Sequence, residues 1–223
     1  MTSRSLNSFV GTGMALLVLS GAGSARALDV TPVADAFVTS ADPTGNYGGG
    51  GALAASATGL PKGELQAVLR FDLAAAKAAF DAAHGVGAWS LSSASLQLTA
   101  ASPGNPVFNA SAAGVVAAQW MQNDSWVEGG GTPSAPGASG ITWSTLPSFL
   151  SGGDQALGTL AFTGATSGTT VYPLTLATGL AADATTGGLA SIRLFANPGD
   201  ASVSGVFNSR SFATAAKMCI RDR

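Results

Sequence analysis

The side chains that could perform catalysis are few in this 223-residue chain. His84 is the only histidine, Cys219 is the only cysteine, and no G-x-S-x-G motif marks a nucleophilic serine. A serine triad needs a histidine beside the nucleophile, and a zinc site needs a cluster of histidine or cysteine ligands. We interpret His84 as a solvated residue at the end of a predicted helix. The sequence therefore favours a non-catalytic protein and gives no basis for zinc.

Paired carboxylates are the remaining enzymatic option, because glycosidases use two acids at a fixed separation. Asp72 and Glu128 are the candidates. Asp72 follows a predicted strand and can cap a helix, and Glu128 lies two residues after Trp126 in a motif better explained by folding. We therefore assign structural roles to both acids and keep a polysaccharide lyase or hydrolase as an alternative.

Two arginines offer another kind of site, since guanidinium groups bind carboxylates in a bidentate way. Strand alternation places Arg70 and Asp72 on the same face of a predicted strand. Inside the fold, Arg70 is expected to pair with Asp35 or Glu128, because buried charges need partners. Arg210 is expected to meet another acid. The alternative is that Arg70 and Arg210 bind the carboxylates of a glycan.

The glycine-rich loop over residues 46–51 is a candidate ligand site. Tyr47 is the aromatic residue that we expect to be exposed there, where glycine lets a ligand approach the backbone, and its ring could pack against a pyranose. Asp35, Asp42 and Asn46 lie near this loop in sequence and offer the oxygen ligands that calcium prefers. The alternative for these polar residues is a network of Asx turns with no ligand.

The charge balance excludes one class of partner. Between Leu28 and Ala216 the chain has five basic and eleven acidic residues, a net charge of −6. Nucleic-acid binding needs a basic face, and none is available. A neutral glycan, or calcium that bridges two sets of carboxylates, suits this balance better than a polyanionic glycan. A single cysteine allows no intrachain disulfide, so the fold depends on its hydrophobic core.

The first 27 residues have the pattern of a secretory signal peptide. Arg4 precedes an apolar run at residues 14–19, and small residues lead to Ala25-Arg26-Ala27, an A-x-A cleavage site. The apolar run is far shorter than the ~20 residues that span a bilayer. We therefore expect an exported protein that is cut after Ala27, with residues 28–216 as one domain.

Alternation and turn residues predict an all-β fold. Short strand-like segments are separated by glycine- and proline-rich turns, which is typical of an antiparallel sandwich or barrel. One helix is expected over residues 73–83, where Asp72 can cap an alanine-rich stretch and Gly85 can close it. A helical turn is also considered over residues 112–120, although Gly114 lowers its propensity. The predicted strands are residues 36–39, 67–71, 95–99, 159–163, 169–176, 191–196 and 202–208.

Seven short motifs follow one another along the chain: Ala34-Asp35-Ala36-Phe37-Val38, Asn46-Tyr47-Gly48, Leu69-Arg70-Phe71-Asp72-Leu73, Ser93-Ala94-Ser95-Leu96-Gln97-Leu98, Trp126-Val127-Glu128, Ile141-Thr142-Trp143 and Phe207-Asn208-Ser209-Arg210. In this order they resemble the DNRLRE (disaggregatase-related) domains, which overlap carbohydrate-binding module family 96. The resemblance spans about residues 33–212, with an inserted alanine-rich helix and a long glycine loop as departures. It implies a non-catalytic, jelly-roll-like antiparallel β-sandwich associated with extracellular polysaccharide. Some members bind alginate-like or other cell-surface glycans, and calcium has been associated with the fold.

Two further stretches, Thr145-Leu146-Pro147 and Asn208-Ser209-Arg210-Ser211-Phe212, make the chain similar to versions of this domain in Gram-negative exported proteins. Those proteins end in a PEP-CTERM sorting tail and are linked to exopolysaccharide production. The resemblance implies a secreted or cell-envelope protein.

The last seven residues, Lys217-Met218-Cys219-Ile220-Arg221-Asp222-Arg223, break the composition of the chain with three basic residues and its only cysteine. Read back into codons, they match a transposon end used to make sequencing libraries, AGATGTGTATAAGAGACAG. We therefore expect residues 217–223 to be a sequencing-adapter artefact and the native protein to continue past Ala216. The missing strand is expected to leave an unpaired sheet edge beside residues 29–38, and the missing tail would provide the membrane attachment.

These observations favour a non-catalytic module outside the cell that binds polysaccharide or belongs to an exopolysaccharide matrix. The main alternative is a structural or adhesive surface protein of the same fold that binds no glycan. The sequence does not identify the sugar.

Overall fold

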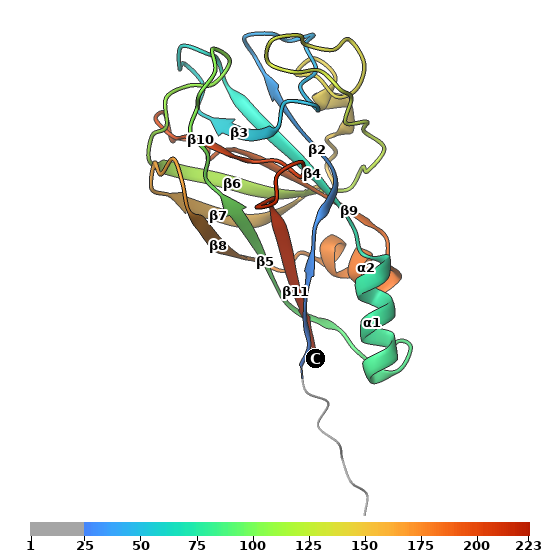
Figure 1. The fold of residues 1–223 in the computed structure, drawn as a ribbon. Coiled ribbons are helices and arrows are strands. Elements are labelled where there is room, and N and C mark those ends of the chain that lie inside the picture. The colour runs from blue at the N-terminus through green and yellow to red at the C-terminus, as the bar shows by residue number, and fades with distance from the viewer. Residues whose placement is uncertain (1–24) are drawn as a thin grey trace, which may run out of the picture.

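The computed structural model describes residues 25–223 as two antiparallel β-sheets with two α-helices beside them (Figure 1). The predicted all-β sandwich is confirmed. The predicted signal peptide lies mainly outside the described residues. Within residues 25–223, no helix has the length and apolar character needed to cross a membrane. The strands are β1 (Ala27–Val30), β2 (Pro32–Thr39), β3 (Ala52–Ser56), β4 (Leu65–Asp72), β5 (Leu91–Thr99), β6 (Gly114–Met121), β7 (Gln155–Phe162), β8 (Thr169–Leu174), β9 (Leu189–Ala196), β10 (Ser204–Asn208) and β11 (Lys217–Asp222).

Strand β4 lies at the centre of the larger sheet and positions the strand that bears Asp35. The larger sheet has the order β10-β3-β4-β9-β6-β7, and β2 pairs with β4 as a seventh strand. In this register Asp35 faces Leu69, which in turn faces Ile192 of β9. The smaller sheet has the order β1-β11-β5-β8, so its first two strands come from opposite ends of the described chain.

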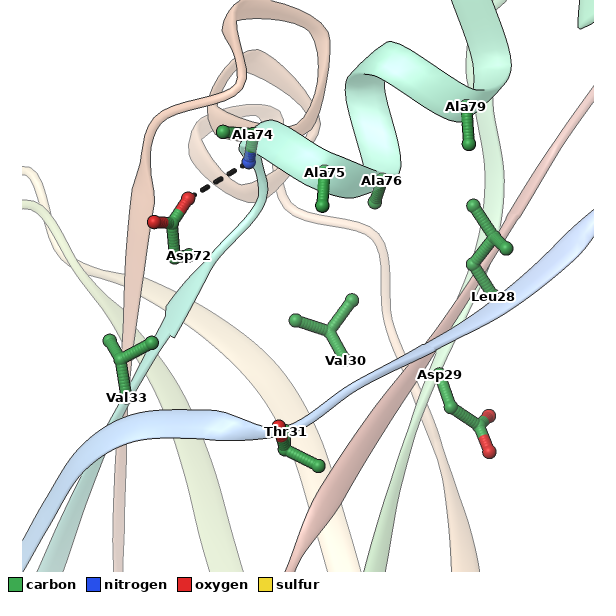
Figure 2. Close-up of a pocket in the computed structure, with 10 residues that line it drawn as sticks. All are labelled: Leu28, Asp29, Val30, Thr31, Val33, Asp72, Ala74, Ala75, Ala76 and Ala79. Carbon is green, nitrogen blue, oxygen red and sulfur yellow. Dashed lines mark hydrogen bonds between the residues drawn. The ribbon is translucent and has the colours of Figure 1, made fainter.

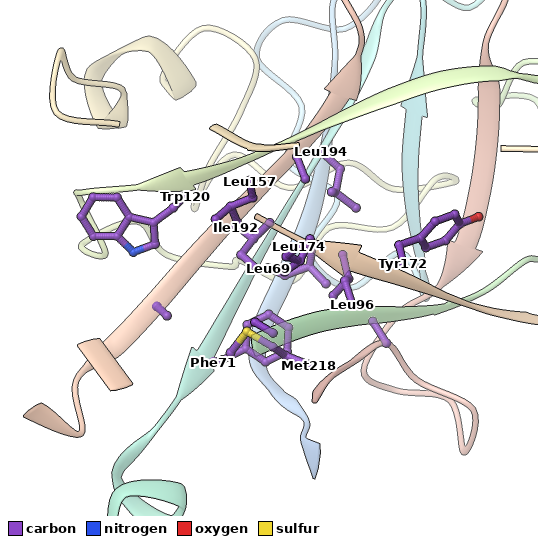
Figure 3. Packing of buried hydrophobic residues seen from close by; sticks show 14 of the residues in the cluster. Leu69, Phe71, Leu96, Trp120, Leu157, Tyr172, Leu174, Ile192, Leu194 and Met218 are labelled. Atoms are coloured by element: carbon purple, nitrogen blue, oxygen red, sulfur yellow. The ribbon is translucent and has the colours of Figure 1, made fainter. Parts of the chain in front are cut away.

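The main core lies between the two sheets (Figure 3). Leu69 and Phe71 of β4 point into it together with Leu96 of β5 and Met218 of β11, and all four are buried. Because side chains alternate along a strand, Arg70 points to the opposite face of the larger sheet, as the sequence predicts. Complete burial of a leucine or phenylalanine side chain contributes about 1.5–3 kcal/mol, so the burial of these side chains stabilises the packing of the two sheets.

A second apolar cluster covers the outer face of the larger sheet. The long β6–β7 connection, residues 122–154, contributes Trp126, Ile141 and Leu146, which pack on Ala36 and Val68 of the sheet. The connection also contains a short 3-10 helix, η1 (Leu146–Phe149). Trp126 is fully buried, and its Nε1 donates a hydrogen bond of 2.9 Å to Ser191 Oγ. This contact anchors the start of the connection, from which Glu128 follows two residues later.

The predicted helix is confirmed as α1 (Ala74–His84), one residue later than expected at each end. Asp72 Oδ1 accepts a hydrogen bond of 2.9 Å from Ala74 N, which satisfies one free N–H of the first turn. A second helix, α2 (Thr178–Thr186), was not predicted, so the expectation of one helix is wrong. The helical turn considered at residues 112–120 is not formed, because residues 114–121 form β6 between β7 and β9.

Residues 217–222 form β11, which hydrogen-bonds to β1 on one side and β5 on the other. β11 therefore pairs with one side of β1, but β1 still lies at the edge of its sheet and β2 pairs only with β4, so each of these strands keeps one side without a strand partner among the described residues. The expected solvation of His84 is also wrong. Its side chain is 12% exposed, and its Nε2 lies 2.9 Å from Oδ2 of the fully buried Asp222. The adapter origin of residues 217–223 stays a prediction.

Candidate functional site

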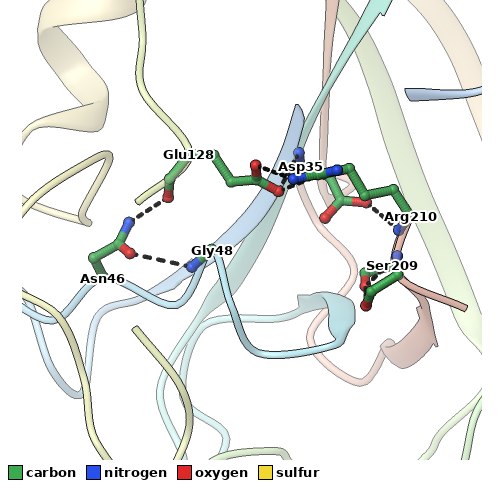
Figure 4. A network of polar contacts seen from close by, with 7 residues as sticks. Asp35, Asn46, Gly48, Glu128, Ser209 and Arg210 are labelled. Atoms are coloured by element: carbon green, nitrogen blue, oxygen red, sulfur yellow. Dashed lines mark hydrogen bonds and ion pairs between the residues drawn. The ribbon is translucent and has the colours of Figure 1, made fainter. Parts of the chain in front are cut away.

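The W-x-E motif, residues 126–128, directs its tryptophan into the apolar interior and its glutamate toward a turn on another segment. Trp126 enters the second apolar cluster, Val127 is 64% exposed, and Glu128 faces the 209–211 turn after β10. Both oxygens of Glu128 accept hydrogen bonds of 2.8 Å from the Arg210 guanidinium, at Nε and Nη2 (Figure 4). The predicted acidic partner of Arg210 is therefore confirmed as Glu128. This hydrogen bonding holds the guanidinium in a fixed plane and raises the pKa of Arg210.

Asp35 lies directly behind this ion pair and joins both chain segments. Its backbone N donates to Glu128 Oε1 at 3.1 Å, and its Oδ2 accepts from the backbone N of Arg210 at 2.6 Å (Figure 4). The side chain is 1% exposed. The pKa of Asp35 is raised to about 6, mainly by burial; the backbone N–H of Arg210 lowers this pKa, and the negative charge of nearby Glu128 raises it.

The buried Asp35 gives a prediction for the pH dependence of stability. Its pKa is about 6 in the folded protein against 3.8 for the ordinary group, so the protonated form favours folding. This contribution is complete below pH 3.8 and is lost as the pH rises through about 6. Asp35→Asn should therefore gain up to about 3 kcal/mol relative to the parent between pH 4 and pH 8.

Urea unfolding at several pH values measures this difference. Asp183 is a matched control, because burial raises its pKa to about 6 as well, although it accepts from Trp120 Nε1 in another part of the fold. Asp183→Asn should show the same sign, and the double variant should show nearly the sum of the two effects. A difference between Asp35→Asn and the parent that is equal at pH 4 and pH 8 would contradict the assignment.

The loop before β3 is held against the 129–140 segment by Asn46. This side chain is fully buried, and its Nδ2 donates to the carbonyl oxygens of Glu128 and Ile141, each at 2.7 Å. The loops touch through their backbones, since a Cβ at Gly48 would lie only 2.1 Å from the Glu128 carbonyl oxygen. Glycine at this position therefore allows the close approach of the two segments that form the site.

These segments enclose a shallow hollow of about 190 Å³, which we call the Arg210 hollow. Its lining is polar and rich in backbone groups, because three of its residues are glycines. The Arg210 side chain is 45% exposed at this hollow, and Nη1 makes no hydrogen bond within the described residues. The lining residues are Asp35, Gly48, Gly49, Glu128, Gly129, Ser209, Arg210 and Ser211.

A larger hollow of about 480 Å³ lies between β1 and α1 (Figure 2). It is lined mainly by apolar residues, among them Val30, Val33 and four alanines of α1. Its carboxylate at Asp72 is already bonded to the start of α1 (Figure 2). The Arg210 hollow offers more convergent polar groups, so it is the better candidate for a polar ligand.

Arg70 is not part of this site. Its Nη1 donates to the carbonyl oxygens of Asp124 and Trp126, each at 2.7 Å, and its guanidinium lies 4.8 Å from the centre of the Trp126 ring. The expected pairing of Arg70 with Asp35 or Glu128 is wrong. Arg70 instead fixes the backbone just before Glu128, and this geometry supports the structural interpretation over the glycan clamp.

Tyr47 does not offer its ring to the solvent, so the expectation that it is the exposed aromatic residue is wrong. Its side chain is 3% exposed and stacks on Phe37 at 4.7 Å between ring centroids. Its hydroxyl donates to Asp42 Oδ2 at 2.8 Å, and burial together with this bond raises the pKa of Tyr47 to about 12. In this conformation the ring cannot stack on a sugar.

The three predicted calcium ligands do not converge. Asp35 lines the Arg210 hollow, Asp42 bonds to Gly45 N and Tyr47, and the oxygen of Asn46 accepts from two backbone N–H groups. In the described part of the chain, no group of three or more His, Cys, Asp and Glu residues could hold a metal ion. Calcium binding stays a prediction, without a ligand set at these positions.

The proposed acid pair is likewise divided between two places. Asp72 accepts a hydrogen bond from Ala74 N at the start of α1, whose N-cap residue is Leu73, whereas Glu128 pairs with Arg210. The carboxylate that lies near Glu128 is Asp35, which the sequence suggested only as a partner of Arg70 or a ligand of calcium. Ser209 and Ser211 were not predicted as site residues. They flank Arg210 in the sequence, and this was the one feature that could have indicated them as site residues.

The comparisons with known proteins add no assignment. No protein-family model matches this chain, and no curated protein matches it either. The resemblance to DNRLRE domains therefore stays a prediction from the motifs.

Proposed function

We propose that the protein is a non-catalytic, exported module that binds polysaccharide at the Arg210 hollow. The observation that supports this proposal most is the guanidinium of Arg210, which Glu128 holds in a fixed plane while nearly half of the side chain remains exposed. A rigid, planar donor beside exposed backbone groups can orient the hydroxyls of a sugar without a large loss of side-chain entropy.

Charge and size favour a neutral polymer. Glu128 and buried Asp35 offset the positive charge of Arg210 locally, so the hollow provides little attraction for a polyanion. A shallow hollow of about 190 Å³ can contact part of a sugar residue and leaves the rest of a chain outside. The signal-peptide pattern of residues 1–27 supports a location where such polymers occur.

Affinity electrophoresis against soluble β-glucan, galactomannan, dextran and alginate tests the proposal. The parent protein should be retarded by at least one neutral polymer, and Arg210→Ala should weaken that retardation about tenfold, which corresponds to one lost charge-assisted contact. Arg210→Lys should also bind weakly, because an ammonium group cannot reproduce the two-pronged contact with Glu128.

Lys77→Ala is the matched control, since it removes another ion-paired cation, on α1. It should bind like the parent. Because a half-exposed ion pair contributes only about 1 kcal/mol or less to stability, Arg210→Ala should remain folded. Failure of every polymer to retard the parent would contradict glycan binding and favour a structural or adhesive role. Release of reducing ends would contradict the non-catalytic part.

A further inference from the structure

One aromatic side chain lies exposed beside the Arg210 hollow. Phe212 is the residue after Ser211, which lines the hollow, and it is 50% exposed. Within residues 25–223 it is the only exposed aromatic residue, since the tyrosines and tryptophans are buried or half-buried. A single exposed apolar residue needs no explanation by itself, so its surroundings decide its meaning.

The Phe212 ring packs against the glycine loop of the site. The backbone N of Phe212 donates to Ser209 O at 3.2 Å, which closes a tight turn around Arg210. A Cβ at Gly51 would lie 3.3 Å from Cε2 of the ring, so Phe212 packs against this glycine. Gly51 is two residues from Gly49, which lines the hollow. The ring thus lies next to both chain segments that form the hollow, one residue after Ser211 and in contact with Gly51, without itself being one of the lining residues.

This arrangement combines the two kinds of contact that a sugar ring offers. The hydroxyls of a pyranose project mainly from its edge, whereas its faces carry C–H groups. The faces can pack against an aromatic ring, as other apolar surfaces do, and the hydroxyls can accept from a guanidinium. Phe212 provides an apolar surface fixed by the backbone, and Arg210 provides an oriented donor two residues away.

We propose that Phe212 is the stacking platform for one pyranose ring of a neutral polymer whose hydroxyls are bound at the Arg210 hollow. This inference rests on the proposed function and adds the ligand class, a hexopyranose with an uninterrupted C–H face. Glucose-type units with equatorial hydroxyls present such faces. A polymer with charged groups would gain less binding free energy at this site, because the Phe212 ring is apolar and Arg210 already pairs with Glu128.

The test uses the intact protein and soluble mixed-linkage β-glucan as the probe, with dissociation constants from affinity electrophoresis. Phe212→Ala and Phe212→Leu should each weaken binding about tenfold, because the ring face is lost in both. Phe212→Tyr should bind like the parent. Val171→Ala, which truncates a 57% exposed apolar side chain on β8, is the control and should change nothing. Thermal melts should place all variants near the parent.

The outcomes separate the two proposals. If Arg210→Ala weakens binding and Phe212→Ala does not, the platform is wrong and the proposed function stands. Equal binding by Phe212→Leu and the parent would also overturn stacking, since a leucine has no ring face. If β-glucan and the other polymers all fail to retard the parent, glycan binding fails and the platform fails with it.

Discussion

A chain that ends at Ala216 is expected to lose its cooperative unfolding transition. Deleting residues 217–223 removes β11, which lies between β1 and β5; β1 then has no strand partner, and β5 is paired only with β8. The deletion also removes Met218 and Ile220, which are buried in the main core. Truncating either side chain to alanine costs about 2–5 kcal/mol, whereas a whole domain is stable by about 5–15 kcal/mol.

Circular dichroism melts of the full and shortened chains provide the measurement. Single variants separate the two causes: Met218→Ala and Ile220→Ala should lower the melting temperature strongly, while Arg221→Ala on the exposed side of β11 should not. A shortened chain that melts like the parent would show that β11 contributes nothing to the fold. The prediction does not depend on the origin of the codons for residues 217–223, because it concerns the chain that contains them.

Asn46→Ala should be the most destabilising single substitution in the loops around the site. Four backbone groups lose their partner: the buried carbonyl of Ile141 and N–H of Gly131, and the half-buried carbonyl of Glu128 and N–H of Gly48. Each unsatisfied buried group costs about 1–3 kcal/mol, so we expect a loss on the order of 4 kcal/mol in the free energy of unfolding.

Urea unfolding of Asn46→Ala beside Asn208→Ala measures this effect. Asn208 is half-buried and makes one side-chain hydrogen bond, from Nδ2 to Thr214 Oγ1, so its loss should cost about 1 kcal/mol or less. The loss of unfolding free energy in Asn46→Ala should be equally large in the presence of a chelator. A calcium ligand would instead lose its effect once calcium is removed, so this comparison distinguishes a structural asparagine from the calcium ligand suggested by the sequence. Equal stability of the two variants would contradict the structural role.

The sequence predicted the strands in which apolar and polar residues alternate strongly. The central strand β4 places Leu69 and Phe71 inward and Arg70 outward, and this pattern is visible in the residues themselves. Strand β3 has the sequence ALAAS, with no β-branched residue, and β6 combines two valines with three alanines or glycines, so neither shows a clear strand pattern. They are strands because their neighbours pair with them, and such tertiary pairing overrides local propensity.

The site was predictable only in part for a related reason. The need of Arg210 for an acid follows from its charge, and Glu128 satisfies it. Arg70 has the same charge but bonds to backbone carbonyls, which every residue carries and no sequence pattern identifies. Tyr47 lies among glycines that indicate exposure, yet those glycines allow backbones to pack closely and bury its ring against Phe37.

The pairing of β1 with β11 has a consequence for how this domain could be built into larger proteins. Ala27 faces Arg221 in that pair, and antiparallel partners lie about 5 Å apart. The N-terminal end of β1 and the C-terminal end of β11 lie at the same pole, at the bottom of Figure 1, while the β2–β3 connection lies at the opposite pole. Segments attached at these two strand ends would therefore meet the domain at neighbouring points, and the pole with the β2–β3 connection would face away from both.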